Sequence, residues 1–245
     1  MHRLATCAAA LALIPLTASA FGPADYVYTP GVTYGEREID LKGGSWKKPG
    51  EARERAWSIG LGYGVTQRWF TEIYRKYQSV GDQSLGDFDA WEWENKFQLT
   101  EPGEHFVDVG FLAEIERPKN RGEGYELRWG PLFQTEVGKV QLNGNLLFER
   151  HVRAEEPQHT QMAYQWQAKY RWRRELEFGL QGFGEMGPWD HWEPADQHSH
   201  RMGPAVFGRV ALGNRQAIRY NAALLRGVSD AAPNQSFRFQ VEYEF

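Results

Sequence analysis

Apolar and polar residues alternate with a period of two through almost the whole chain, and this limits the fold more than any other feature. The pattern is sharpest at the C-terminus, where the apolar set is Phe237, Phe239, Val241, Tyr243 and Phe245. The residues between them are Arg238, Gln240, Glu242 and Glu244. Successive side chains of a β-strand point to opposite faces, so this period predicts a strand with one apolar and one polar face.

About twelve segments show the same alternation, and the one near residues 31–41 is the least regular. Short connectors follow every second segment, at residues 66–68, 100–105, 138–139, 173–175 and 213–215. The longer polar connectors are residues 42–54, 79–87, 117–122, 152–159, 186–201 and 227–236. Short turns at one end and longer loops at the other are typical of outer-membrane barrels. We therefore predict an all-β fold, a single 12-stranded antiparallel transmembrane β-barrel with N- and C-termini in the periplasm.

The alternation alone does not say which face points outward. A soluble, lipocalin-like barrel would carry its apolar face inside. The apolar face here is rich in Trp, Tyr, Phe and Leu, which suits lipid, and the polar face is rich in Glu, Arg, Gln and Asn, which suits water. We expect the apolar face to contact lipid, and closure then follows because an open sheet edge would leave backbone groups unpaired in hydrocarbon.

The first twenty residues form a separate segment. Arg3 precedes an apolar run that is too short to span a bilayer, and Ala18-Ser19-Ala20 fits a cleavage site. We predict a signal peptide over 1–20, cleaved before Phe21, and a barrel over 21–245. Cleavage would remove one base, Arg3, and so change the formal charge from −4 to −5. It would also remove Cys7, the single cysteine. A net acidic chain argues against a nucleic-acid partner.

Export and the barrel pattern together predict localisation in the outer membrane of a Gram-negative bacterium. Only about ten residues separate Phe21 from the first expected strand. We therefore expect no separate domain and no long plug inside the barrel.

Three stretches support a narrower resemblance. They are Tyr63–Trp69 (YGVTQRW), Leu127–Pro131 (LRWGP), and Tyr220–Leu225 (YNAALL) with the loop that follows it. The chain resembles Gram-negative outer-membrane barrels and, in these stretches, a family of outer-membrane transporters labelled after the MetA pathway of phenol degradation. The resemblance implies fold and location and assigns no catalytic residues. The alternating Phe239, Val241, Tyr243 and Phe245 resemble the signal that the barrel-assembly machinery reads during insertion.

The polar face supplies the first functional hypothesis, a charged lumen. Acids dominate it between residues 69 and 149, and bases are more frequent after residue 160. Opposed walls of this kind would focus a field across a narrow pore and favour small polar solutes. An alternative is that these charges pair across strands and block the lumen. The predicted pore-lining residues are Glu72, Glu92, Glu94, Asp108, Glu114, Glu126, Arg128, Glu136, Glu149, Lys169, Arg171, Arg209, Arg219 and Arg238.

The external loops supply two further hypotheses. The loop over residues 186–201 holds Asp190, His191, Glu193, Asp196, His198 and His200, a set that suits a divalent transition metal but equally suits a solvated loop. The sequence His198-Ser199-His200 is the closest approach to a nucleophile and base, yet neighbours in a strand point to opposite faces. We predict no catalytic residues, no bound metal and no cofactor.

The main prediction is an outer-membrane channel for small, polar solutes that works by passive or facilitated diffusion. The first alternative is a non-conducting barrel that acts through its external loops, with or without metal. A membrane hydrolase is the second. The expected partners are outer-membrane lipid and lipopolysaccharide, the barrel-assembly machinery, and a small-molecule solute.

Overall fold

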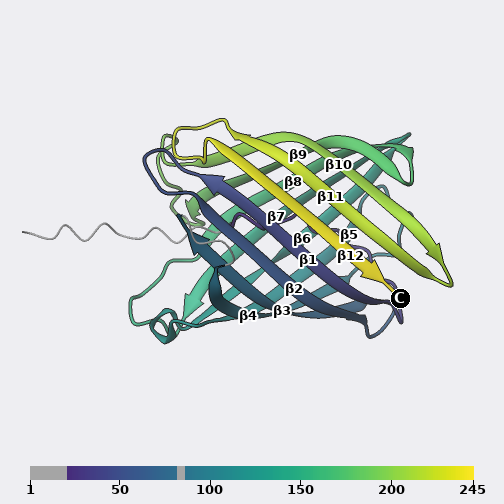
Figure 1. The fold of residues 1–245 in the computed structure, drawn as a ribbon, viewed down its shortest axis with the longest axis horizontal. Helices are drawn as coiled ribbons and strands as arrows, with labels where there is room; N and C mark the ends of the chain where they lie inside the picture. Colours follow the sequence, from purple (N-terminus) through teal and green to yellow (C-terminus); the bar gives the residue numbers. More distant parts are fainter. Residues whose placement is uncertain (1–20, 82–85) are drawn as a thin grey trace, which may run out of the picture.

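The computed structural model describes residues 21–81 and 86–245, and in them the chain forms one closed barrel (Figure 1). Each strand pairs antiparallel with its sequence neighbours, and β1 pairs with β12 to close the sheet. The predicted fold class is confirmed. The strands are β1 (Arg37–Lys47), β2 (Glu54–Gly64), β3 (Trp69–Val80), β4 (Asp87–Gln98), β5 (Asp108–Pro118), β6 (Tyr125–Val137), β7 (Val140–Val152), β8 (Gln161–Arg173), β9 (Leu176–Pro188), β10 (Ser199–Gly213), β11 (Gln216–Gly227) and β12 (Gln235–Glu244).

The first strand begins later than the sequence predicts. β1 covers Arg37–Lys47, whereas the expected segment lay near residues 31–41. The predicted signal peptide, residues 1–20, lies outside the described residues. Within the described part of the chain, no helix is long and apolar enough to cross a membrane. The one helical element there is a single 3₁₀ turn, η1 (Arg121–Glu123).

The two ends of the barrel differ as predicted. We call the end that holds Arg37 and Phe245 the turn end, and the opposite end the loop end. In Figure 1 the C-terminus marks the turn end, and the longer connections lie at the other end. The β10–β11 turn consists of Asn214 and Arg215, both with positive φ, which matches the twist of two-residue hairpins.

The β4–β5 connection is an exception to the predicted short turns. It runs over residues 99–107, longer than expected. Side chains build it: the Thr100 hydroxyl accepts a hydrogen bond from the Val109 amide at 2.8 Å, and the Asp108 carboxylate accepts one from the Gly103 amide at 2.8 Å. These local bonds replace the strand pairing that a tighter hairpin would make.

The apolar face points outward, as predicted. Leu61, Ile73 and Trp93 are about half or more exposed, while their polar neighbours Glu72 and Glu94 are buried in the lumen. The other strands also place their large apolar side chains outward, although some carry apolar residues on the inward face as well. A soluble barrel would carry its apolar face inside. Here most of the large apolar side chains lie on the outside, so the soluble alternative is wrong.

The lumen is filled by the N-terminal segment, residues 21–36, which we call the inner segment. Its Phe21, Val27 and Tyr28 are among the most buried side chains of the protein. They pack against inward-facing apolar residues such as Leu112, Phe183 and Phe207. The expectation of no plug is wrong. The segment has no alternating pattern, so nothing local marks where it lies.

Inward-facing glycines make room for the inner segment. A Cβ atom added at Gly44 would lie 1.8 Å from the carbonyl oxygen of Pro23, and one added at Gly64 would lie 2.0 Å from that of Thr33. Real Cβ atoms do not approach so closely. Glycine therefore lets the segment lie directly against the barrel wall, from the turn end at Thr33 to deep in the lumen at Pro23.

Candidate functional site: the barrel lumen

The inner segment is bound to the barrel wall through two of its three tyrosines, Tyr26 and Tyr28. The Tyr26 hydroxyl donates to the Glu94 carboxylate at 3.0 Å, and the Tyr28 hydroxyl donates to Glu114 at 2.5 Å. The Lys42 ammonium lies 4.1 Å from the centre of the Tyr26 ring, within the range of a cation–π contact. Acids on β4 and β5 thus hold the segment through bonds to charged acceptors.

The backbone of the segment is satisfied as well. The Tyr28 amide donates to the Gln165 side chain at 3.3 Å, and the Tyr28 carbonyl accepts from Asn145 at 3.0 Å. Nearer the turn end, the Val32 amide donates to Gln98 at 2.9 Å. Buried backbone groups need hydrogen-bond partners, and the inward-pointing Gln and Asn side chains of β4, β7 and β8 supply them.

Three cations, Lys42, Lys76 and Arg128, pair with the inward-facing acids of β4 to β7. Lys76 contacts Glu92 at 2.9 Å and Glu116 at 2.5 Å. Lys42 lies 3.9 Å from Glu94. Each of these ammonium groups lies among acids from neighbouring strands and pairs with part of the acidic wall.

Arg128 is the most connected of these cations. Its guanidinium donates to Glu149 at 3.0 Å and lies 3.3 Å from Glu126 and 3.6 Å from Glu114. It also approaches Asp25 of the inner segment at 3.8 Å. One arginine therefore joins β5, β6, β7 and the inner segment.

The structure places most of the predicted pore-lining residues on the inward face. The buried ones are Glu72, Glu92, Glu94, Glu114, Arg128, Glu149 and Arg238, and Glu126 is nearly so. Asp108, Glu136 and Arg171 lie near the turn end, and Arg171 lines the cavity there. Asp108 binds the β4–β5 turn, and Glu136 pairs with Arg171 at the exposed rim of the turn end. That these residues line a conducting path remains a prediction.

The predicted basic wall is largely paired. Lys169 contacts Glu177 at 3.2 Å, and Arg209 contacts Glu244 at 2.7 Å. Arg219 also bonds to Glu244. Arg238 lies deeper, where it donates to Gln181 at 2.7 Å. The two walls are therefore closer to local neutrality than a simple acid-against-base division implies.

Sequence analysis missed a charged group on β1. Glu38, Asp40 and Lys42 point inward, and Asp40 accepts from the Tyr74 hydroxyl at 2.7 Å and from Gln240 at 3.0 Å. Their alternation with Ile39 and Leu41 was a usable signal. It was missed because the first half of the expected segment, before Arg37, lies outside the strand and makes the pattern over residues 31–41 irregular.

A cavity of about 640 Å³ lies between the inner segment and the turn end. It is lined by charges of both signs. The cations are Lys96, Lys169, Arg171, Arg174, Arg209 and Arg219, and the acids are Glu36, Glu38, Glu72, Glu177 and Glu242. We call it the turn-end cavity. Its size and lining suit water and small polar or zwitterionic molecules.

The histidine-containing loop is shorter than predicted, because β9 extends to Pro188 and β10 begins at Ser199. His200 contacts the Tyr164 hydroxyl at 2.9 Å, and its amide donates to the Ser229 hydroxyl at 2.8 Å. These bonds hold His200 to β8 and the β11–β12 loop. In the described residues, the side chains that lie close enough together to hold a metal ion are on the inner face of β4 to β7, outside this loop.

Comparison with known proteins shows the fold. No protein-family model matches the chain, and no curated protein matches it. Solved structures do. The COG4313 outer membrane channel from Pseudomonas putida F1 has a TM-score of 0.57 at 14% identity, with 90% of this chain and 98% of that chain covered. This is the fold of an outer-membrane β-barrel.

Two other solved barrels are similar to a comparable degree. The NanC porin has a TM-score of 0.53 at 9% identity, with 84% of this chain and 98% of that chain covered. The translocator domain of the autotransporter NalP from Neisseria meningitidis has a TM-score of 0.52 at 14% identity, with 87% of this chain and 89% of that chain covered. At these identities the similarity concerns architecture alone.

Proposed function

We propose that this protein is an outer-membrane channel for small polar solutes. The observation that carries the proposal is the turn-end cavity, a polar space lined by six cations and five acids inside a closed barrel. A lumen of this chemistry replaces the hydration of a polar solute and offers little to an apolar one. The similarity in fold to a porin and to an outer membrane channel supports the proposal. The apolar outer face supports a position in the bilayer.

Membership of the transporter family labelled after the MetA pathway is part of this proposal. The three sequence stretches support it, together with the architecture shared with the COG4313 channel. The family label points to aromatic substrates. The charged lining of the turn-end cavity favours polar ones instead.

Ion selectivity in a planar bilayer tests the proposal. In the protein with Arg209→Gln and Arg219→Gln, we expect reversal potentials under a salt gradient to move toward cation preference, because the cavity loses two of its cations. Arg150→Gln is the matched control, because this exposed arginine on β7 lines neither the turn-end cavity nor the pocket at the loop end. Unchanged selectivity in the double variant would contradict a conducting path through the cavity.

One observation favours the second candidate, a barrel that binds ligands through its loops without conducting. The inner segment fills the middle of the lumen, and a pocket of about 800 Å³ at the loop end is lined by Lys47, Arg53 and Arg226. A folded, heat-modifiable protein that shows no conductance steps in any variant would support this candidate.

A further inference from the structure

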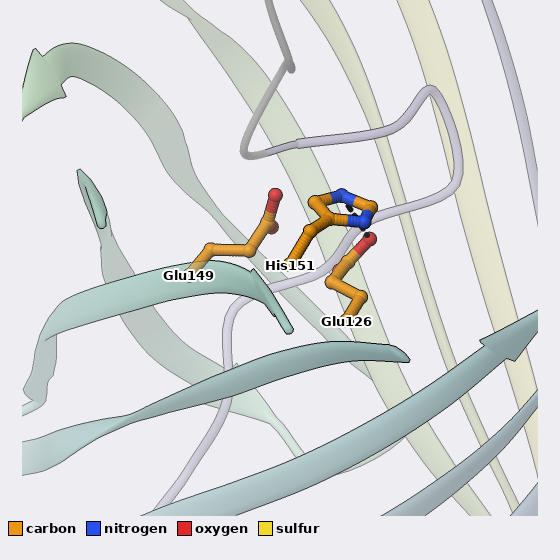
Figure 2. Close-up of side chains that lie close together, drawn as sticks. All are labelled: Glu126, Glu149 and His151. Atoms are coloured by element: carbon orange, nitrogen blue, oxygen red, sulfur yellow. Dashed lines mark ion pairs between the residues drawn. The ribbon is translucent and has the colours of Figure 1, made fainter. Parts of the chain in front are cut away.

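A histidine and two glutamates meet on the inner face of β6 and β7 near the loop end, where Glu126, Glu149 and His151 converge (Figure 2). Glu126 and His151 are direct partners in the β6–β7 ladder, and Glu149 lies two residues before His151 on the same face of β7. One ligand atom from each side chain lies within 4.8 Å of the other two. The rigid sheet therefore holds all three in place.

The hydrogen bonding of His151 fixes which nitrogen is available. Its Nδ1 lies 3.1 Å from the carbonyl oxygen of Glu123, and a carbonyl oxygen only accepts. Nδ1 must therefore carry the proton, and in the neutral ring Nε2 then presents a lone pair. A backbone carbonyl that orients the second nitrogen is the usual support of a metal-binding histidine.

That lone pair faces a carboxylate. Nε2 of His151 lies 3.6 Å from Oε2 of Glu126, which is too long for a hydrogen bond. Two ligand atoms bound to one zinc ion at about 2.0–2.1 Å and at the tetrahedral angle lie about 3.4 Å apart. The observed separation is therefore close to that of two ligands of one cation.

Arg128 orients two of the three candidate ligand residues. It binds Oε1 of Glu126 and Oε2 of Glu149, so it orients both carboxylates while Oε2 of Glu126 faces His151. The side chains of Glu126 and His151 are each 16% exposed, which leaves a route from the loop end. A cation entering there would meet one imidazole and two oriented carboxylates.

The second acidic group of the lumen differs in these respects. Glu92, Glu94 and Glu114 also lie within ligand distance of one another, but they include no imidazole. Their partners are Lys76, Tyr26 and Tyr28. Glu94 and Glu114 thus hold the inner segment, and Glu92 pairs with Lys76.

We propose that Glu126, Glu149 and His151 form a binding site for a first-row divalent cation such as Zn²⁺. Imidazole combined with carboxylate suits this class of ion, whereas Ca²⁺ prefers oxygen ligands alone. The proposal does not depend on conduction, so it stands or fails separately from the channel function.

Isothermal titration of the refolded, full-length barrel tests the site, with ZnCl₂ as the probe and CaCl₂ for comparison. We expect one zinc ion per chain. His151→Ala should weaken binding about 100-fold or more, and Glu126→Gln about 10-fold or more, since each removes one ligand.

His191→Ala is the matched control, because this exposed histidine lies in the β9–β10 loop. It should leave zinc affinity unchanged. Heat-modifiable migration on gels confirms that each variant is folded, and Glu126→Gln, which changes one atom of a carboxylate, serves if His151→Ala does not fold. Absence of zinc binding by the unmodified protein, equal affinity for Ca²⁺, or loss of binding in His191→Ala would each overturn the proposal.

Discussion

At the scale of single residues, the buried charges of the lumen are stabilised only because they meet. Arg128 lies within 4 Å of carboxylates from Asp25, Glu114, Glu126 and Glu149. Taking these ions out of water is costly, and their mutual attraction offsets the cost only while the set is complete. Removing one member leaves the others buried without a counter-charge.

Arg128→Met should therefore lower the free energy of unfolding by about 3–5 kcal/mol. Arg68→Met should change it by about 1 kcal/mol or less, because the Arg68–Glu101 pair is more than half exposed to solvent. Denaturant unfolding of both variants in lipid vesicles, followed by tryptophan fluorescence, measures the difference. Equal midpoints for the two variants would show that the lumenal network contributes little.

At the scale of elements, the inner segment depends on the shape of the strands around it. Its carbonyls approach β1 and β2 where glycine leaves no side chain, at Gly44 and Gly64. Its Tyr26 and Tyr28 reach acids on β4 and β5. The strands thus form a binding surface, built from Gly44, Gly64, Glu94 and Glu114, for a segment that has no regular structure of its own.

Gly44→Val should displace the inner segment while the barrel stays closed, because the new side chain would occupy the position of the Pro23 carbonyl. The expected result is rapid cleavage near residues 21–36 by an added protease, with the strands left intact. Gly144→Val is the control, since a Cβ there meets nothing within 4 Å. Mass spectrometry identifies the fragments. An N-terminus that stays protected in Gly44→Val would contradict the requirement for glycine where the inner segment contacts the barrel wall.

At the scale of the whole molecule, the inner segment decides whether the barrel conducts. The turn-end cavity ends where Tyr26 and Tyr28 cross the lumen. Water and ions can enter this cavity from the turn end, and the inner segment restricts the passage beyond it.

Deletion of residues 21–34 should therefore raise single-channel conductance several-fold in a planar bilayer relative to the full chain. The deletion leaves every strand in place, since β1 begins at Arg37. Heat-modifiable migration establishes that the shortened barrel is folded. A folded deletion variant with the conductance of the full chain would show that ions bypass the segment or that other residues close the lumen.

The sequence by itself determined the strand number, the closed antiparallel order and, for the strands after β1, which side chains share a face; the composition of the two faces indicated which one points outward. These follow from a period of two along each strand, a property that is local in the chain. The outward position of Ile73 and Trp93, and the inward position of Glu72 and Glu94, could be read directly.

Only the tertiary structure decided what fills the barrel and which charges meet. The inner segment has no period to read, and its contacts join residues far apart in sequence, as Tyr28 joins Asn145. The Asp40–Gln240 bond joins residues 200 positions apart. Likewise, Glu126, Glu149 and His151 converge only because β6 and β7 pair in one register. Such contacts depend on barrel closure, and closure is a property of all twelve strands together.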